Sequence, residues 1–414
     1  MRRAVLRALA PSLALVVLAC GDEGRSPPSY SGSPGQPTPL TIDRGIPWVE
    51  AVVGSRTTPL LLDTGSPLTV LGGQAAAGTP AGRSALSLQA FGLSFPRLEV
   101  VVLGQPVDLS TPCDGVQGQG QLGHDLVGHF RLRLDYREGQ GALFDTTGDG
   151  TALAPETAAV VTVPFDLLGG GSAQLAGIDP LRVPASRVVV ETTVEGVAGT
   201  ALVDTGSTLT LLSQRLLSSL PETGRPRACC IALRLPTGTV NALLVRLGRL
   251  QLGGASSGNL VAAVLSGPAP FDALSAETGR EIEMILGGSF LRLHALEIDY
   301  PASRLRLATY QPASHIDPDE YLLPGFSFCR SGDGDGMLVV TVFEATDAAA
   351  QGVTPGARFT AVDGTPVATL GATEVLALMH QRADGDSLRI TFATGQGTTE
   401  ERLLRLQRVL PDYR

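Results

Sequence analysis

Residues 60–71 read LLLDTGSPLTVL, and residues 201–212 read ALVDTGSTLTLL. In both stretches a short apolar run leads into Asp-Thr-Gly-Ser, and an alternating apolar segment follows. Short apolar runs bounded by a glycine-containing turn are typical of buried β-strands. A β-like stretch also precedes each copy, at 48–53 and 188–194. The chain therefore contains one strand–loop–strand unit twice.

A second pair of matching segments lies downstream of the two loops. Residues 122–123 and 286–287 both read Leu-Gly, and each is followed by a strand-like segment, LRLDY at 132–136 and LEIDY at 296–300. The leucine of Leu-Gly and the aspartate of the strand are thirteen residues apart in both copies. This repeated order predicts a chain built from two versions of one β-rich unit.

The composition fits this prediction and excludes several classes of function. The chain has 414 residues, 50 of them glycine, with 43% hydrophobic and 17% charged residues. That is enough apolar material for packed cores joined by many tight turns. The formal net charge of −9 disfavours nucleic acid as a partner. The five histidines are scattered without metal-ligand spacing, so we expect no metal site and no cofactor.

Paired Asp-Thr-Gly-Ser loops, each with a later apolar-Gly element, resemble those of the pepsin-like and retropepsin-like aspartic peptidases. The resemblance covers roughly residues 41–312. It implies a mostly β fold with a first aspartic-peptidase lobe at 41–183 and a homologous second lobe at 184–312, each an acid-protease-like β-barrel. In that family the two loops meet at a pseudo-twofold axis, with a water between the catalytic aspartates, here Asp63 and Asp204.

The chemistry of peptide hydrolysis explains the need for two carboxyl groups. A peptide bond requires an activated water and a protonated leaving nitrogen. Two carboxylates held close together do not easily ionise together, so they share one proton. The ionised aspartate then serves as general base for the water, and the protonated one polarises the carbonyl.

The same resemblance implies supporting roles for the residues around the pair. These are Thr64 and Thr205 for hydrogen bonds across the axis, Gly65 and Gly206 for close backbone approach, Ser66 and Ser207 for hydrogen bonds to the outer carboxylate oxygens, and Leu122, Gly123, Leu286 and Gly287 for packing behind the loops. Because the serines would stabilise the charged form, we expect an acidic working range.

Three features depart from the family pattern or need an alternative. Gln121 stands before Leu-Gly where an apolar residue is usual, whereas the second copy has Ile285. No tyrosine lies between the first loop and Leu-Gly to serve in a flap, so Phe91 or Phe95 takes that role or belongs to the core. Asp145, in Asp-Thr-Thr-Gly, follows a different kind of segment, and we interpret it as a turn residue.

The N-terminus reads as a targeting segment. Arginines precede an apolar run that is short for a membrane span and typical of a secretory leader, residues 1–19. Residues 17–20 read VLAC, which resembles a bacterial lipoprotein lipobox and implies acylation of Cys20. Residues 20–40 are rich in Gly, Ser and Pro and predict a flexible tether. We therefore expect a lipid-anchored protein of the cell envelope, associated with the inner or outer membrane.

Residues 313–414 form a predicted separate module. Strands are expected at 337–342 and 358–362 and a helix at 372–381, in an order that resembles a PDZ domain of bacterial proteases. Ala357 stands where an acidic residue is usual in that domain. The implied carboxylate-binding loop comprises Leu323, Pro324, Gly325 and Phe326. An extended peptide or C-terminus would add to the neighbouring strand; the alternative is that this α+β module only packs against the lobes.

Cysteine pairing is left open by the sequence. Cys113 could pair with Cys229 or Cys230 between the lobes, or some cysteines could remain buried thiols, and neighbours in sequence rarely bond each other. Cys329 is a fourth candidate in the exported chain.

Two functions of different classes fit these observations. The first is an endopeptidase acting on protein or peptide substrates, and the second is a noncatalytic peptide-binding lipoprotein. The matched Asp-Thr-Gly-Ser pair favours the first, because a binding module has no need for two matched carboxyl groups. Both loops lie in one chain, which favours a monomer over a single-lobe peptidase that must dimerise.

Overall fold

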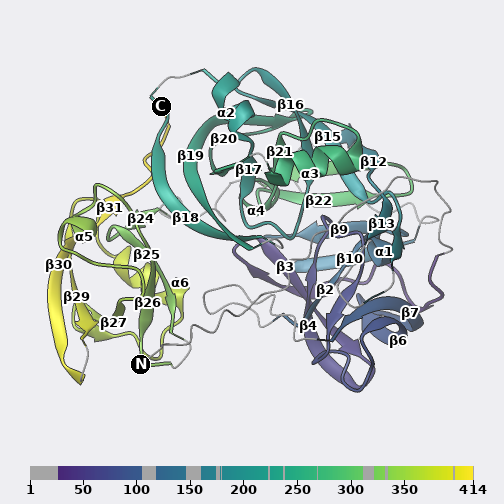
Figure 1. The fold of residues 1–414 in the computed structure, drawn as a ribbon, viewed down its shortest axis with the longest axis horizontal. Coiled ribbons are helices and arrows are strands. Elements are labelled where there is room, and N and C mark those ends of the chain that lie inside the picture. Colours follow the sequence, from purple (N-terminus) through teal and green to yellow (C-terminus); the bar gives the residue numbers. More distant parts are fainter. Residues whose placement is uncertain are drawn as a thin grey trace, which may run out of the picture.

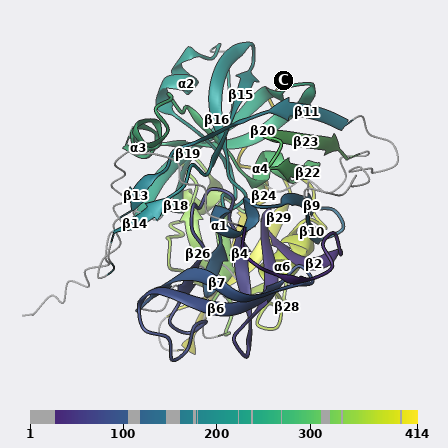
Figure 2. The same ribbon diagram turned by 90° about the vertical axis from the view of Figure 1, so that its right-hand side faces the viewer.

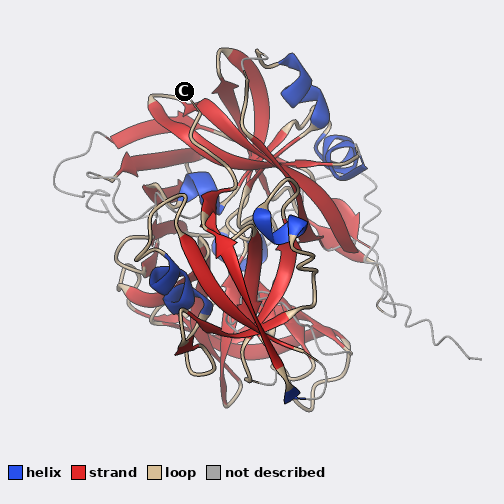
Figure 3. Cartoon of the chain, turned by 90° about the vertical axis from the view of Figure 1, so that its left-hand side faces the viewer, coloured by secondary structure: helices blue, strands red, loops and turns tan. Residues whose placement is uncertain are grey.

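The computed structural model describes residues 27–104, 118–145, 160–173, 178, 180–221, 224–235, 238–267, 269–310, 321–331, 334–394 and 397–413. The fold is mostly β, with short helices between strands (Figure 3). Two lobes of barrel-like sheets are followed by a smaller C-terminal module, which lies beside them in Figure 1. In the described part of the chain no helix is long and apolar enough to cross a membrane. The predicted leader, 1–19, and Cys20 lie outside the described residues.

The described residues of the first lobe form ten strands and one short helix. They are β1 Ser31–Gly32, β2 Thr38–Asp43, β3 Ile46–Val53, β4 Arg56–Leu62, β5 Val70–Gly72, β6 Gly82–Ala90, β7 Leu93–Leu103, β8 Gly120–Leu122, α1 His124–Val127, β9 Arg131–Asp135 and β10 Gln140–Phe144. Strand β8 lies between β4 and β5, parallel to β4 and antiparallel to β5. The two-residue turn Phe91-Gly92 has φ values of 55° and 71°, the left-handed pair that a tight β-hairpin requires.

The second lobe repeats this arrangement. Its elements are β15 Arg187–Val194, β16 Val197–Val203, β17 Thr210–Leu212, α2 Gln214–Ser219, β18 Arg227–Leu235, β19 Gly238–Leu252, β20 Ala255–Leu265, α3 Ala269–Thr278, β21 Met284–Leu286, α4 Gly288–Leu291, β22 His294–Asp299 and β23 Arg304–Thr309. Strand β21 lies between β16 and β17, as β8 lies between β4 and β5. The β-branched run in β15 favours a strand buried on both faces.

Strands β9 and β22 join the two lobes in one sheet, in the order β10-β9-β22-β23. They are the matched segments LRLDY and LEIDY, and they pair antiparallel with Arg133 opposite Glu297. These two residues hold equivalent positions in the repeat, so an approximate twofold axis passes between them. Figure 2 shows the four strands side by side.

The segment between the lobes corrects the predicted boundary at residues 183 and 184. Its strands are β11 Val160–Pro164, β12 Asp166–Leu168, β13 Gly171–Ala173 and β14 Leu181–Val183. Strand β11 pairs with β23 and so extends the sheet that joins the lobes, and β12 pairs with β15 in the sheet of the second lobe. The hairpin of β13 and β14 instead packs against Leu68 of the first lobe. The connection therefore contributes to both lobes.

The predicted tether at 20–40 is also shorter than expected. The ring of Tyr30 packs against Phe95 and Phe130, with ring centroids 6.1 and 5.4 Å apart. Strand β1 then pairs with β7, and β2 joins the sheet of the first lobe. A buried aromatic contact and strand pairing outweigh the turn-forming composition of this stretch, so residues from Tyr30 onward belong to the lobe.

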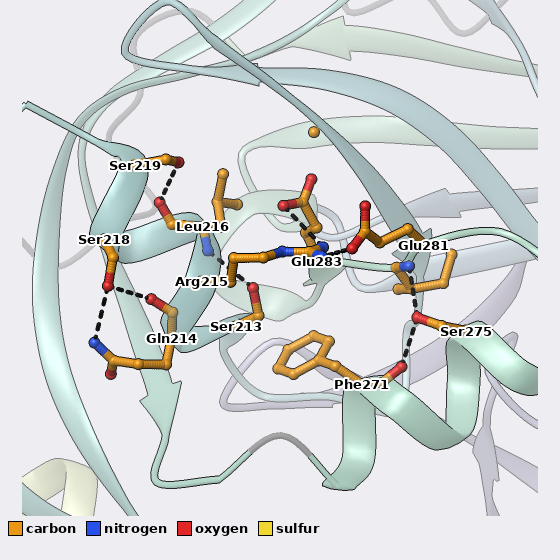
Figure 4. Close-up of polar contacts among 12 residues, drawn as sticks. Ser213, Gln214, Arg215, Leu216, Ser218, Ser219, Phe271, Ser275, Glu281 and Glu283 are labelled. Atoms are coloured by element: carbon orange, nitrogen blue, oxygen red, sulfur yellow. Dashed lines mark hydrogen bonds and ion pairs between the residues drawn. The ribbon is translucent and has the colours of Figure 1, made fainter.

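Polar contacts hold helix α2, which follows the second Asp-Thr-Gly loop and β17, in place (Figure 4). Ser213 caps its N-terminus by accepting a hydrogen bond from the N–H of Leu216 at 3.1 Å. Arg215 forms ion pairs with Glu281 and with Glu283, the latter at 3.1 Å. These surface pairs connect α2 to the segment that leads into β21, each adding at most about 1 kcal/mol.

The C-terminal module has a sheet and a core of its own. Its elements are β24 Leu322–Leu323, β25 Phe326–Arg330, β26 Met337–Val342, α5 Asp347–Ala350, β27 Arg358–Val362, β28 Thr365–Pro366, α6 Ala372–Met379, β29 Ser387–Ala393, β30 Thr399–Arg405 and β31 Gln407–Arg408. The sheet order is β25-β26-β27-β29-β30. Its core contains four phenylalanine rings in tilted and edge-to-face contact, those of Phe326, Phe328, Phe359 and Phe392.

The module packs on the second lobe. Alternate residues of β20 point to opposite faces of the β18–β20 sheet. The apolar side chains of one face pack in the main core, and those of the other face lie in a second apolar cluster. That second face, with Leu244 and Val261, shares an apolar cluster with Leu323, Phe343 and Leu410 of the module and the chain end. The module therefore packs against the second lobe.

The end of the chain adds polar contacts to this interface. Arg246 donates to the carbonyl of Leu410 at 3.3 Å, and the side-chain amide of Asn259 donates to Asp412 at 2.6 Å. The guanidinium of Arg225 lies over the ring of Tyr413, 5.0 Å from its centroid. Residues 407–413 thus hold the module to the lobe from a second direction.

Candidate active site

Asp63 and Asp204 occupy equivalent places at the ends of two buried strands. The backbone N–H of Asp63, which follows β4, donates to the carbonyl of Leu122 at 3.1 Å. The N–H of Asp204, which follows β16, donates to the carbonyl of Leu286 at 3.0 Å. The predicted Leu-Gly elements therefore hold the two strand ends from which the aspartates project.

The two loops face each other so closely that only glycine fits at their third position. A Cβ on Gly65 would lie 2.6 Å from the carboxyl carbon of Asp204. A Cβ on Gly206 would lie 2.9 Å from that of Asp63. Each carboxyl group therefore lies against the glycine of the opposite loop, and a hydrogen bond joins the two carboxyl groups.

Thr64 and Thr205 link the loops through reciprocal hydrogen bonds. The N–H of Thr64 donates to Oγ1 of Thr205, and the N–H of Thr205 donates to Oγ1 of Thr64, both at 3.1 Å. Oγ1 of Thr205 donates to the carbonyl of Leu62 at 2.6 Å, and Oγ1 of Thr64 donates to that of Val203 at 3.2 Å. Both threonines are fully buried. The structure thus contains the contact expected across the axis.

Removing one hydroxyl from this link is expected to destabilise the fold strongly. In Thr205→Val the buried N–H of Thr64 loses its acceptor and the carbonyl of Leu62 loses its donor, which should lower the free energy of unfolding by roughly 2–4 kcal/mol. Thr205→Ser keeps the hydroxyl and is the matched control. Urea unfolding of both variants measures the difference; equal midpoints for serine and valine would contradict the assignment.

The glycines of the Leu-Gly elements allow the backbone to pass behind the loops. A Cβ on Gly123 would lie 2.4 Å from the carbonyl oxygen of Leu68, and one on Gly287 would lie 2.2 Å from that of Leu209. Any larger residue would push the Asp-Thr-Gly-Ser loop out of place, so these glycines are required by close approach. Their packing role agrees with the expectation from the sequence.

The surroundings of the pair raise the pKa of both aspartates, and most of all that of Asp63. Desolvation is the first cause for Asp63, followed by the charge of Asp204 and the hydrogen bond to it. Desolvation also raises the pKa of Asp204, but the N–H of Gly206, which donates to its Oδ1 at 2.8 Å, and the hydrogen bond from Asp63 lower it. The pair therefore retains one shared proton at pH values where ordinary carboxyl groups have lost theirs.

Arg187 is a buried charge near the pair that was not among the predicted site residues. Its positive charge lowers the pKa of both aspartates. Its guanidinium forms two hydrogen bonds with the carboxylate of Glu277, at 2.7 and 3.0 Å. In the first lobe the equivalent strand begins with Ile46. A charged residue in place of an apolar one, seen when the two repeats are aligned, is the signal that could have identified it.

The structure corrects the predicted role of the serines. The hydroxyl of Ser66 donates to the carbonyl of Leu68 at 2.9 Å, and that of Ser207 donates to the carbonyl of Leu209 at 2.8 Å. A hydroxyl has one proton, so neither serine also donates to a carboxylate. Each serine therefore closes a local turn after its loop, and the argument that serines lower the pKa of the pair fails.

The two candidates for a flap residue belong to the core instead. Phe91 and Phe95 are 1% and 0% exposed and pack inside the main apolar cluster. Phe91 lies in the hairpin turn between β6 and β7, yet its ring turns inward. Gln121, the other departure from the family pattern, donates its side-chain amide to Oγ of Ser66.

The predicted carboxylate-binding loop lies between β24 and β25. Leu323 and Phe326 are buried, and Gly325 has a φ of +88° beside the side chain of Thr346. Pro324 has no N–H, so this position of the loop offers no donor to a carboxylate. Strand β25 forms one edge of the module's sheet.

The remaining predicted residues form no further site. The structure bonds Cys229 to Cys230, a pairing between neighbours that the sequence argument disfavoured. Cys113 lies outside the described residues, and Cys329 is buried. Within the described ranges, no group of three or more His, Cys, Asp or Glu side chains is arranged to hold a metal ion.

Comparison with known proteins places a peptidase pattern on the second lobe. Residues 190–290, which include Asp204 and Leu286-Gly287, match the family model described as Aspartyl protease. A search of curated proteins found no match. Similar solved structures include an aspartic proteinase from Irpex lacteus (15% identity, 69% of this chain and 99% of that chain, TM-score 0.39) and Basic 7S globulin from soybean (11%, 70% and 97%, TM-score 0.37). Another is a retropepsin-like aspartic protease from Rickettsia conorii (15%, 37% and 91%, TM-score 0.24).

Proposed function

We propose that this chain is an aspartic endopeptidase that uses Asp63 and Asp204. The observation that carries the proposal is the meeting of two equivalent carboxyl groups between interlocked loops. A structural turn needs neither a half-buried pair of carboxyl groups nor its repetition in both lobes. The aspartyl protease family match over the second loop supports the same conclusion.

The shared proton divides the roles between the two aspartates. The ionised aspartate acts as general base and removes a proton from the attacking water. The protonated aspartate donates a hydrogen bond to the carbonyl oxygen of the scissile peptide. The proton taken by the general base then passes to the leaving nitrogen, which balances the hydrolysis.

Cleavage of an unfolded protein tests the proposal directly. The purified chain is expected to cleave casein, and the transition-state inhibitor pepstatin is expected to block that cleavage. Peptide binding without any cleavage across pH 3–8 (about the range over which carboxyl pairs and histidines titrate) would instead support the noncatalytic peptide-binding lipoprotein.

The pH dependence of cleavage follows from the raised pKa of Asp63. Activity requires the shared proton, so it is present below the raised pKa and is lost as the pH rises through it; the basic limb should lie above the ordinary carboxyl pKa of about 4. The double variant Ser66→Ala/Ser207→Ala should leave this limb in place, because both hydroxyls donate to backbone carbonyls. A rate profile of both proteins measures it; a limb that moves with the serines would restore their predicted role.

The module and the N-terminus add two further proposals. The edge strand β25 would receive an extended peptide or C-terminus by strand addition and so bring substrates to the protein. Acylation of Cys20 would anchor the protein in the cell envelope. Fractionation of cells that produce the wild type and Cys20→Ser is expected to move only the variant into the soluble fraction; equal release of both would exclude the anchor.

A further inference from the structure

The two lobes present different side chains beside the pair at one equivalent position. Gln121 is the parallel partner of Leu61 in the first lobe, and Ile285 is the partner of Leu202 in the second. Leu61 lies two residues before Asp63, as Leu202 lies two before Asp204, and alternate residues of a strand share a face. Gln121 and Ile285 therefore lie on the same face of their sheets as the aspartates.

The neighbours of these two residues are apolar in both lobes. Gln121 also pairs with Val70, and Ile285 also pairs with Leu211, so each position has one leucine and one further apolar partner beside it. The strand partners of both residues are thus apolar, and at this position the lobes differ by an amide against an aliphatic group. Ile285 is 8% exposed, whereas Gln121 is more exposed and reachable.

The hydrogen bonds of Gln121 leave part of its amide available. Its Nε2 donates to Oγ of Ser66, and the single proton of Ser66 is committed to the carbonyl of Leu68. Among the described residues, no donor contacts Oε1 of Gln121, and its second N–H has no acceptor. An apolar group seated against this amide would remove water from it without replacing the lost hydrogen bonds, which is costly.

We propose that Gln121 makes the cleavage site asymmetric: the first lobe accepts an uncharged hydrogen-bonding side chain, such as Asn, Gln, Ser or Thr, on one side of the scissile bond, and the second lobe accepts an apolar side chain on the other. This inference rests on the proposed peptidase function. A neutral amide offers both a donor and an acceptor but no charge to offset a carboxylate, and the pair itself carries negative charge. Acidic side chains at this position are therefore disfavoured.

Four peptides that differ only at the two residues flanking the scissile bond test the proposal. These residues are Leu–Leu, Leu–Asn, Asn–Leu and Asn–Asn, because leucine and asparagine have similar shapes. The wild type should cleave one of the two mixed peptides with a kcat/KM roughly tenfold or more above Leu–Leu, the size expected for one satisfied hydrogen bond. In Gln121→Ile this ratio should fall below one.

A swap of the two residues provides the matched control. In Gln121→Ile/Ile285→Gln the amide moves to the second lobe, so the preferred mixed peptide should change to the one with the opposite order. Should the swap fail to fold, the wild-type ratios and Gln121→Leu decide the question. Equal cleavage of both mixed peptides and Leu–Leu by the wild type, or a preference unchanged in Gln121→Ile, would overturn the inference. If the wild type cleaves none of the four peptides, or if Asp63→Asn cleaves them equally well, the proposed peptidase function is refuted instead.

Discussion

Replacing either aspartate with asparagine is expected to lower kcat by roughly 10²–10⁴-fold, since proton transfer by a positioned group contributes rate factors of about this size. Asparagine keeps the shape of the side chain but neither removes a proton from water nor holds one for the substrate. Because Asp63 and Asp204 share one proton and act as a unit, the double variant should be little worse than either single variant. Steady-state rates on a defined peptide measure all three.

The fold should survive these substitutions. Burial raises the pKa of both carboxyl groups, which means that the charged form of the pair destabilises the fold. An uncharged amide removes this destabilisation. Unfolding midpoints of Asp63→Asn and Asp204→Asn should equal or exceed that of the wild type near neutral pH. Asp145→Asn, in the similar Asp-Thr-Thr-Gly stretch, is the control and should keep full activity. Near-normal turnover by either catalytic variant would contradict the two-aspartate assignment.

The two Asp-Thr-Gly-Ser loops could be predicted from sequence because their requirements are local. Each Asp-Thr-Gly-Ser follows an apolar strand, and the Leu-Gly spacing is the same in both copies, so the paired β4–β8 and β16–β21 arrangement follows from one pattern read twice. The strands predicted at 337–342 and 358–362 are likewise confirmed as β26 and β27, because alternating apolar residues between turns are a strong local signal.

The features that the sequence did not reveal depend on partners far away in the chain. The hydroxyls of Ser66 and Ser207 could serve either a carboxylate or a nearby carbonyl, and only the path of the backbone decides between them. Arg187, whose charge acts on the pair, donates a hydrogen bond to Glu277, ninety residues later in the chain. Strand β11 was predicted to lie in the first lobe, but its partner β23 is the last strand of the second lobe. The residue type indicates which groups need a hydrogen-bonding or strand partner, but the path of the chain determines which partner each group meets.

Removal of the C-terminal module, by ending the chain after Tyr310, is expected to prevent the second lobe from folding stably. A module attached only by a linker would be dispensable for cleavage of short peptides. Here, however, Leu323, Phe343 and Leu410 share an apolar cluster with the β18–β20 face. Burial of one such side chain contributes about 1.5–3 kcal/mol, and a whole domain is stable by only about 5–15 kcal/mol. The truncated chain should therefore aggregate or bind a hydrophobic dye, and lose activity on short peptides as well as on proteins.

Single substitutions separate this docking from the module's own stability. Leu410→Ala, at a fully buried position of the interface, should lower the free energy of unfolding by roughly 2–4 kcal/mol. Leu403→Ala is the matched control, because Leu403 lies in β30 with 59% of its surface exposed and should change stability by less than about 0.5 kcal/mol. Urea unfolding of both variants measures the contribution of this interface to stability. The urea midpoint and short-peptide turnover of the truncated chain show whether the second lobe folds without the module. A truncated chain that unfolds at the wild-type midpoint and cleaves short peptides normally would show that the module is an independent domain, and that the β18–β20 face tolerates exposure to water.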